Sequence, residues 1–247
     1  MSSSDDNSVM DFFSQLPQQG PGTDADTIAV LDIVRNDLPK NPTVIDFGCG
    51  TGRTTLALAE QLPDSHVVGI DALEVFVDVL ERSIASRKLS HRIEAHIGDM
   101  ANPPSSLPRA DLIWCEGAVY HIGFAEALRI WRPLLSPRSY CVISECEWLS
   151  DAPPKPVADY WRENYPAMTD RQSNLRQAAD AGYEVIRTQT LSDKGWDEYY
   201  GLISAAIGRG DALHLGTEFS ERLLEEREIR DQANGSYGYV FYVMRKR

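Results

Sequence analysis

The feature that most constrains the fold is a short strand that runs directly into a glycine-rich turn. Residues 43–47 (TVIDF) are β-branched, apolar or aromatic apart from one acid, and the next five residues, GCGTG, contain three glycines. A helix is expected to follow at once. Glycine permits positive φ and lets a ligand approach the backbone, and the free N–H groups at the start of the helix point at that ligand. The motif predicts a ligand site at the carboxyl edge of a parallel sheet.

Strand-like and helical segments alternate along the rest of the chain. Further strands are expected at 66–70, 92–97, 111–115, 140–146, 183–191 and 237–245, and helices at 54–62, 73–87, 124–134, 171–181, 194–207 and 218–232. This order predicts an α/β fold with a doubly wound, seven-stranded and mostly parallel sheet. The last strand has no crossover of its own and is therefore expected to run antiparallel.

The chain is expected to form one domain with additions around the sheet. Residues 1–10 are polar and acidic and are expected to be a disordered tail, with a single domain over 11–247. Residues 11–40 would form an N-terminal cap, in which Thr23 N-caps a helix that Pro39 ends. Residues 148–170 contain four prolines and several aromatic residues, so they are expected to be a lid-like insertion over one end of the sheet.

Composition narrows the partners and the compartment. The 247 residues include 24 Lys and Arg against 37 Asp and Glu, a formal charge of −13, which disfavours strong binding to nucleic acid or anionic membrane. We find no signal peptide and no apolar run long enough to span a bilayer. The four cysteines form no C-x-x-C pair, so we expect no metal site and a cytoplasmic protein with free thiols. A homodimer is left open as the oligomeric state.

The glycine spacing argues against two nucleotide-binding motifs. A dinucleotide fingerprint beginning at Gly48 would place its third glycine where this chain has Arg53, and a phosphate loop would need Lys after Gly52. Asp46, just before the turn, would repel a phosphate and attract an ammonium group. The glycine turn is therefore not expected to bind a phosphate.

Two further acids follow the next two strands. Asp71 ends the second strand about twenty residues after the turn, where an acid can accept hydrogen bonds from ribose hydroxyls. Asp99 ends the third strand, where it can accept from an adenine amino group. Acids at three strand ends suit a ligand with an amine, a ribose and a base but no phosphate, and S-adenosylmethionine is such a ligand.

The ordered motifs VIDFGCGTG, VVGIDAL, IGDM and DLIWCEGAVYHIGF resemble those of class I S-adenosylmethionine-dependent methyltransferases, over residues 40–146. The segments QGPG, EGAVYHIGF and SECEW are similar to a bacterial subgroup of these enzymes that act on small molecules. That subgroup commonly has Asn in place of His121. The resemblance implies a Rossmann-like methyltransferase fold. It also implies cofactor contacts from Gly20, Gly22, Asp46, Gly48 and Gly50 at the methionyl end, Asp71, Ala72 and Leu73 at the ribose, Asp99 and Met100 at the adenine, and Glu116 and Gly117 near the sulfonium.

Candidate catalytic residues follow the fourth strand. Glu116 ends that strand at the carboxyl edge and is expected to line the methyl-transfer pocket, although a salt bridge is the alternative. Tyr120 and His121 lie on the same loop. A lone histidine is more often a structural hydrogen-bonding residue than a base, so catalysis by His121 is the less favoured interpretation.

Aromatic residues of the insertion are candidates for an acceptor pocket. Trp148, Trp161 and Tyr165 could wall the pocket or belong to the core. An acidic run at residues 225–228 is expected to be the solvated face of a helix.

Methyl transfer from a sulfonium mainly requires alignment of donor and acceptor and exclusion of water. A general base is needed only when the acceptor must lose a proton. We therefore expect an S-adenosylmethionine-dependent methyltransferase with a small-molecule acceptor. The alternatives are a tRNA or protein methyltransferase, a non-catalytic S-adenosylmethionine-binding protein and a nicotinamide-dependent oxidoreductase, against which Arg53 argues.

Overall fold

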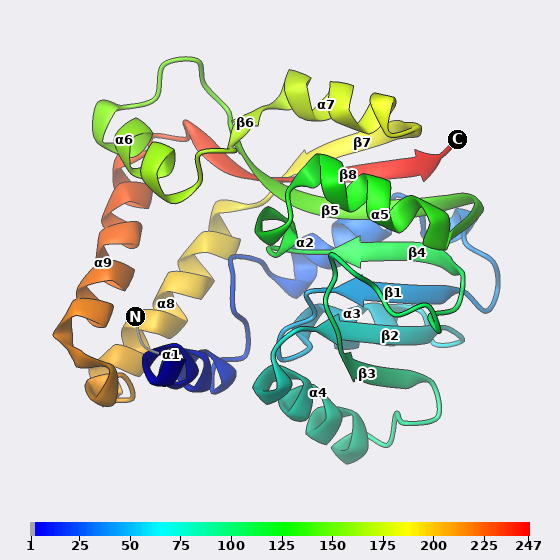
Figure 1. Cartoon of the computed structure of the whole chain (residues 1–247), viewed down its shortest axis with the longest axis horizontal. Helices are drawn as coiled ribbons and strands as arrows, with labels where there is room; N and C mark the ends of the chain where they lie inside the picture. The colour runs from blue at the N-terminus through cyan, green and yellow to red at the C-terminus, as the bar shows by residue number, and fades with distance from the viewer. Residues whose placement is uncertain (1–2) are drawn as a thin grey trace.

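A mixed sheet forms the centre of the computed structural model, which describes residues 3–247 (Figure 1). Its strands are β1 (Thr43–Phe47), β2 (His66–Asp71), β3 (Ile93–Ile97), β4 (Ala110–Cys115), β5 (Leu135–Trp148), β6 (Thr169–Asp170), β7 (Tyr183–Thr190) and β8 (Tyr237–Lys246). The order is β3-β2-β1-β4-β5-β8-β7, and β6 pairs with β5. β8 is antiparallel to β5 and β7, whereas the other pairs are parallel. The predicted doubly wound sheet with an antiparallel last strand is confirmed.

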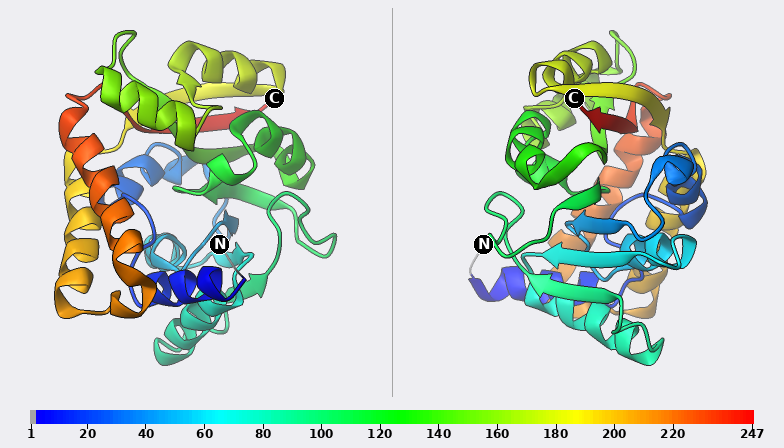
Figure 2. Two further views of the ribbon diagram at one scale, coloured as in Figure 1. Left: turned by 60° about the vertical axis from the view of Figure 1, so that its left-hand side comes forward. Right: turned by 90° about the vertical axis from the view of Figure 1, so that its right-hand side faces the viewer.

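Helices cover both faces of the sheet and one of its ends (Figures 1 and 2). They are α1 (Ser3–Ser14), α2 (Asp24–Leu31), α3 (Arg53–Gln61), α4 (Glu74–Ser86), α5 (Phe124–Trp131), α6 (Lys155–Asn164), α7 (Arg171–Asp180), α8 (Asp193–Arg209) and α9 (Gly216–Gln232). Short 3-10 turns lie at Arg35–Asp37, Val119–His121, Arg132–Leu134 and Leu213–Leu215. Within the described residues, none of the helices has both the length and the apolar character needed to cross a membrane.

Alternate side chains of each inner strand point to opposite faces, as the period of a strand requires. Val44 and Leu112 belong to the apolar cluster that includes residues of α2, α3 and α4. Their neighbours Ile45 and Ile113 belong to the cluster that includes residues of α5 and α7. Because helices cover both faces of the sheet, the inner parallel strands are apolar on both sides. They therefore appear in the sequence as nearly continuous runs of apolar residues.

The N-terminal segment differs from the expectation. Residues 1–10 are predicted to be disordered, yet the structure has helix α1 from Ser3 onward, while residues 1 and 2 lie outside the described part. Phe12 is buried and its ring meets Phe219 of α9 edge-on, with centroids 5.6 Å apart. This contact between residues far apart in the sequence explains why local polarity is a poor guide here.

Thr23 caps α2 as predicted, and its hydroxyl accepts a hydrogen bond from the Asp26 N–H at 3.0 Å. The helix ends at Leu31, however, well before Pro39, and the 3-10 turn Arg35–Asp37 completes the segment.

Four helices stand at the carboxyl end of the parallel strands. In Figure 1 the arrowheads of β1, β2 and β4 point toward the side where α1, α8 and α9 lie, and α6 lies above them. α6 comes from the insertion at 148–170 and packs against α9. Helices from both ends of the chain therefore enclose the sheet edge at which a ligand was expected.

The buried Phe12–Phe219 contact predicts that packing of α1 against α9 contributes to the free energy of unfolding. Phe12→Ala should lower the free energy of unfolding by about 3–5 kcal/mol, because it removes a fully buried ring. Leu213→Ala, at a side chain that is 83% exposed, should change it by less than about 0.5 kcal/mol. Urea denaturation measures both, and equal stability of the two variants would contradict the packing of α1.

Candidate functional site

A cavity of about 1350 Å³ opens at the carboxyl edge of the sheet. Pockets for a single small molecule usually measure roughly 300–1,000 Å³, so this cavity has room for two ligands side by side. One end is formed by loops that follow the strands and the other by helices. The loop end includes Gly20, Gly48, Gly50, Asp71, Ala72, Leu73, Asp99, Met100, Gly117 and His121, and the helix end includes Phe13, Tyr160, Tyr199, Phe219, Leu223 and Glu226.

The glycine turn after β1 has the backbone conformation that its sequence predicts. Gly48, Gly50 and Gly52 have φ values of +68°, +54° and +97°. A Cβ on Gly48 would lie 2.3 Å from the Cβ of Ala118, and one on Gly52 would lie 2.3 Å from Cδ1 of Leu80. The turn therefore requires glycine both for its φ angles and for its close packing.

Asp71 joins the glycine turn to the loop after β2. The Gly50 N–H donates to one carboxylate oxygen at 2.9 Å, and the Leu73 N–H donates to the other at 3.0 Å. The side chain lines the cavity, and burial raises its pKa despite these hydrogen bonds. Each oxygen keeps a further lone pair that a ligand hydroxyl could use.

Asp99 and Met100 lie at the same end, after β3. Asp99 is exposed, and its Oδ1 accepts the Ala101 N–H at 2.8 Å. Met100 is half-buried, and its carbonyl accepts the Trp131 Nε1–H at 2.9 Å. Both residues line the cavity, as does the Ala72–Leu73 segment. The loops after β2 and β3 thus come together where the sequence expected them.

Asp46 lies elsewhere than the resemblance implies. It is buried beneath the glycine turn, where the Thr55 hydroxyl donates to its Oδ2 at 2.6 Å, and it is not among the cavity-lining residues. Burial raises its pKa to about 7, and the nearby carboxylate of Glu116 adds to this effect. Asp46 supports the turn from below, because β1 directs its side chain toward α3 and away from the ligand space.

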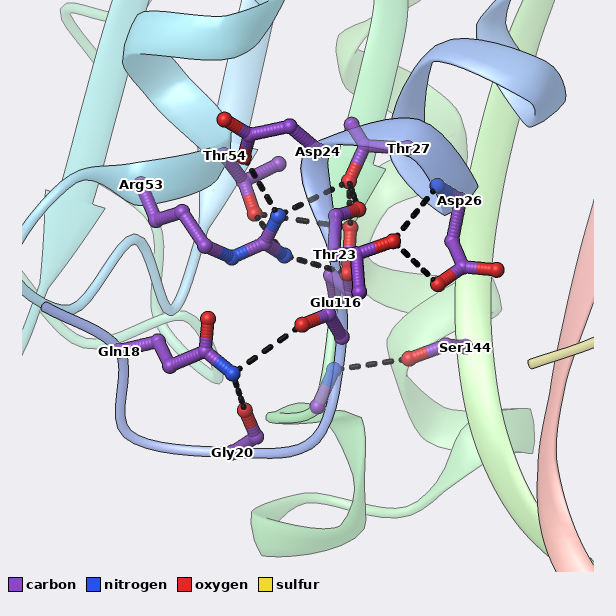
Figure 3. A network of polar contacts seen from close by, with 12 residues as sticks. Gln18, Gly20, Thr23, Asp24, Asp26, Thr27, Arg53, Thr54, Glu116 and Ser144 are labelled. Carbon is purple, nitrogen blue, oxygen red and sulfur yellow. Dashed lines mark hydrogen bonds and ion pairs between the residues drawn. The ribbon is translucent and has the colours of Figure 1, made fainter. Parts of the chain in front are cut away.

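The QGPG segment, residues 19–22, packs against the glycine turn through Gln19, and the preceding Gln18 braces the segment (Figure 3). The Gln18 side chain donates to the carbonyls of Gly20 and Gly22, at 3.2 and 3.1 Å. The Gln19 side chain accepts the Thr51 N–H at 3.0 Å. Gly20 lines the cavity but Gly22 does not. Gly22 instead backs onto Glu116, since a Cβ there would lie 2.5 Å from Glu116 Oε1.

Glu116 is held by several partners in a buried network (Figure 3). Its Oε1 pairs with Arg53 Nη2 at 2.5 Å. Its Oε2 accepts from the Thr27 hydroxyl at 2.9 Å and from Trp114 Nε1 at 3.3 Å. Arg53 also pairs with Asp24 at 3.1 Å. Although Glu116 lines the cavity, the salt-bridge interpretation of this residue describes its surroundings better than the catalytic one.

Tyr120 and His121 face the cavity from the 3-10 turn that follows β4. Burial raises the pKa of Tyr120 to about 12. Burial lowers the pKa of His121, and the charge of Asp71 opposes this shift only in part. At neutral pH the phenol is therefore protonated, and the imidazole is largely neutral.

Trp148, Trp161 and Tyr165, the expected pocket walls, are half-buried, pack against the core and are not among the residues that line the cavity. The Trp161 ring lies against Tyr237, with centroids 4.9 Å apart, and the Tyr165 hydroxyl donates to Glu145 Oε1 at 2.9 Å. The turn of α6 directs other side chains of the insertion into the cavity: Pro156, Asp159, Tyr160, Glu163 and Asn164.

The helix end of the cavity was missed by sequence reasoning. Phe219, Leu223 and Glu226 lie at i, i+4 and i+7 along α9 and all line the cavity. The expectation that residues 225–228 form only a solvated face is therefore wrong for Glu226, which is half-buried. The helical spacing of these residues was the available signal, but a mixed apolar and acidic face does not look like a core-facing stripe.

The Arg53–Glu116 pair should be strongly coupled in a double-mutant cycle. Arg53→Met, Glu116→Gln and the double variant should give a coupling energy of about 2 kcal/mol in urea unfolding, because the pair is buried. The exposed pair Arg87–Glu60 serves as the control and should give at most about 1 kcal/mol. Equal coupling for the two pairs would contradict a structural role for the network.

Asp46 should make the protein less stable as the pH rises. Its pKa is about 7 in the folded chain against an ordinary value of 3.8, so the unfolded chain releases this proton first. The free energy of unfolding should therefore fall between about pH 4 and pH 7.

Asp46→Asn keeps an acceptor for Thr55 and should reduce this slope, which urea unfolding at several pH values measures. Glu145, whose pKa burial also raises to about 7, keeps part of the slope in the variant. An identical slope in wild type and variant would show that Asp46 ionises normally.

Comparison with known proteins assigns a family. Residues 38–207, well over half of the chain, match the model of the methyltransferase domain family. The O-methyltransferase cnsE of Penicillium expansum is 26% identical over 202 residues, which cover 80% of this chain and 69% of that protein. The release factor glutamine methyltransferase of Rhodopirellula baltica is 31% identical over 75 residues, which cover 30% of this chain and 25% of that protein.

Solved structures share the fold over nearly the whole chain. An S-adenosylmethionine-dependent methyltransferase from Thiobacillus denitrificans, in complex with S-adenosylhomocysteine, superposes with a TM-score of 0.81 at 19% identity, covering 97% of this chain and 98% of that one. The [4+2]-cyclase SpnF superposes with a TM-score of 0.74 at 20% identity, covering 94% and 85%. On the match of residues 38–207, the chain belongs to the methyltransferase domain family.

Proposed function

We propose that this protein is a methyltransferase that uses S-adenosylmethionine and transfers the methyl group to a small-molecule acceptor. The observation that carries the proposal is the fixed orientation of the Asp71 carboxylate. Its carboxylate faces the cavity while backbone N–H groups of Gly50 and Leu73 hold both of its oxygens in place. An acid so fixed beside a glycine turn suits the vicinal hydroxyls of a ribose.

The loop end of the cavity suits the rest of the cofactor. A Cβ built on Gly20 or Gly117 would meet no atom within 4 Å, so the backbone there borders open space that the methionyl group could occupy. Asp99 and Met100 would hold the adenine. Arg53, a cation of this wall, is already paired with Glu116 and Asp24, which disfavours a phosphate-bearing ligand.

S-adenosylmethionine would supply a methyl group activated by its sulfonium charge. The residues of this chain then have to position the acceptor and exclude water. α1, α6, α8 and α9 wall the space beyond the glycine turn, and we assign residues 148–170 the role of a lid over it. His121 can accept a proton where the acceptor must lose one, and Tyr120 can donate a hydrogen bond.

A small acceptor is favoured over a macromolecule. The formal charge of −13 and the acidic side chains of the cavity oppose a nucleic-acid substrate. The motifs QGPG, EGAVYHIGF and SECEW resemble a bacterial subgroup that methylates small molecules, and cnsE is an O-methyltransferase. The [4+2]-cyclase shares the fold, so turnover itself has to be measured.

The direct test is a screen of small-molecule extracts with cofactor that is radiolabelled in the methyl group. Label should appear in a small product in the presence of the protein, and not with heat-denatured protein. Label that enters only tRNA or protein would support the alternative acceptors. Cofactor binding without transfer to any fraction would support a non-catalytic binding protein.

Calorimetry tests the assignment of Asp71. S-adenosylhomocysteine should bind, whereas NAD and ATP should not. Asp71→Ala should weaken S-adenosylhomocysteine binding by about tenfold to a hundredfold, because it removes charge-assisted hydrogen bonds worth roughly 1.5–3 kcal/mol. Asp78→Ala, at an exposed carboxylate on α4, should leave the affinity unchanged. Comparable affinity for NAD, or full affinity in a folded Asp71→Ala variant, would refute the assignment.

A further inference from the structure

The helix end of the cavity contains a largely buried tyrosine whose hydroxyl has no partner among the described side chains. Tyr199 of α8 is 6% exposed and lines the cavity. Its hydroxyl makes no hydrogen bond to the described side chains, which are those of residues 8–247. Buried polar groups are nearly always satisfied, by protein or by a bound molecule. An unpartnered phenol aimed into a cavity therefore indicates that the ligand of this end brings a polar group.

Glu226 of α9 is the second unusual group at this end. One carboxylate oxygen accepts the Tyr200 hydroxyl at 3.0 Å. The described residues supply Glu226 with no ion-pair partner, although the side chain is half-buried and lines the cavity. Burial raises its pKa. A carboxylate removed from water in this way gains from a cation that approaches it.

Aromatic side chains line the same cavity as this carboxylate. Tyr120, Tyr160 and Tyr199 all line the cavity. Burial raises the pKa of each of these phenols, and the negative charge of Glu226 raises it further. Tyrosine rings attract a cation through their faces as well as through hydrogen bonds.

Most of the other charged side chains that line this end are acidic. Glu163 and Glu225 also line the cavity and add negative charge. Asp159 is paired with Lys155 and Arg162. Arg222 lines the cavity too, but it is already engaged in an interaction of its own. The helix end is thus acidic and aromatic at once.

We propose that this end of the cavity recognises the methyl acceptor through an organic ammonium group, which Glu226 and the rings of Tyr120, Tyr160 and Tyr199 enclose. The inference rests on the proposed function, because it names the chemical class of the acceptor of that reaction. A neutral acceptor would provide a partner for the Tyr199 hydroxyl but would leave Glu226 with the Tyr200 hydroxyl and no cation. A phosphate-bearing acceptor would be repelled by the carboxylate.

The test uses the full chain saturated with S-adenosylhomocysteine and two probes of similar shape, phenethylammonium and the neutral 2-phenylethanol. Calorimetry should show the ammonium binding at least about tenfold more tightly than the alcohol. Glu226→Gln should remove most of this preference by weakening the ammonium alone. Glu228→Gln, at an exposed position on the same helix, should leave both affinities unchanged. Tyr199→Phe keeps the ring and should retain the preference for the ammonium.

The outcomes separate this inference from the proposed function. If S-adenosylhomocysteine binds but the two probes bind equally, or the ammonium does not bind, the cation site is wrong and the proposed cofactor site stands. If the Glu226→Gln variant still prefers the ammonium over the alcohol as strongly as wild type does, the cation site is also wrong. If S-adenosylhomocysteine fails to bind, the proposed function fails, and the same titrations on the chain alone still decide whether the ammonium site exists.

Discussion

The buried ion pair between Arg53 and Glu116 joins parts of the chain that lie far apart in the sequence. Arg53 begins α3 directly after the glycine turn, and Glu116 follows β4. Thr27 of α2 donates to the same carboxylate, and Gly22 packs against it without a side chain. The N-terminal segment, the glycine turn and the loop after β4 therefore take up their positions together. Removing Arg53 would leave the Glu116 carboxylate buried without a cation beside it, which is costly.

The two ends of the cavity differ in origin: one is common to many α/β proteins, and the other is built by helices added to the sheet. The loop end is built by turns at the carboxyl edge of the sheet, a position that binds ligands in many α/β proteins. The helix end is built by α1, α6, α8 and α9, which are additions to the sheet. Side chains of these helices line the cavity apart from the glycine turn. A shared fold with the cyclase SpnF at 20% identity fits this division, because the fold alone does not fix the reaction.

Local patterns in the sequence predicted the sheet and the loop end of the cavity well. The runs that became β1, β2 and β4 are apolar on both faces, and the glycines at 48, 50 and 52 adopt the positive φ that the motif implies. Asp71 faces the cavity because a strand end and a tight turn fix its direction locally. Asp46 shows the limit of such reasoning. The sequence shows that Asp46 precedes the glycine turn. It does not show whether the side chain faces the cavity or the core beneath the turn, because that depends on its hydrogen bond with Thr55 of α3.

The helix end depends on contacts that no local pattern contains. α1 is polar at its start and is held by Phe12 against Phe219, more than two hundred residues later. Trp161 and Tyr160 are neighbours, yet α6 directs Tyr160 into the cavity and Trp161 onto Tyr237. Glu226 resembled a surface acid because the contact that holds its side chain comes from Tyr200 of α8, a different element. Side-chain direction, set by tertiary packing, was the missing information in each case.

The central claim is that the loops after β1, β2 and β3 form the cofactor half of the cavity and that the helices form the acceptor half. A crystal structure of the chain grown with S-adenosylhomocysteine tests it most directly. We expect the ribose hydroxyls against Asp71, the adenine beside Asp99 and Met100, and the sulfur directed toward the space walled by Tyr199 and Glu226. A ligand seated among α1, α8 and α9 with Asp71 untouched would contradict the account.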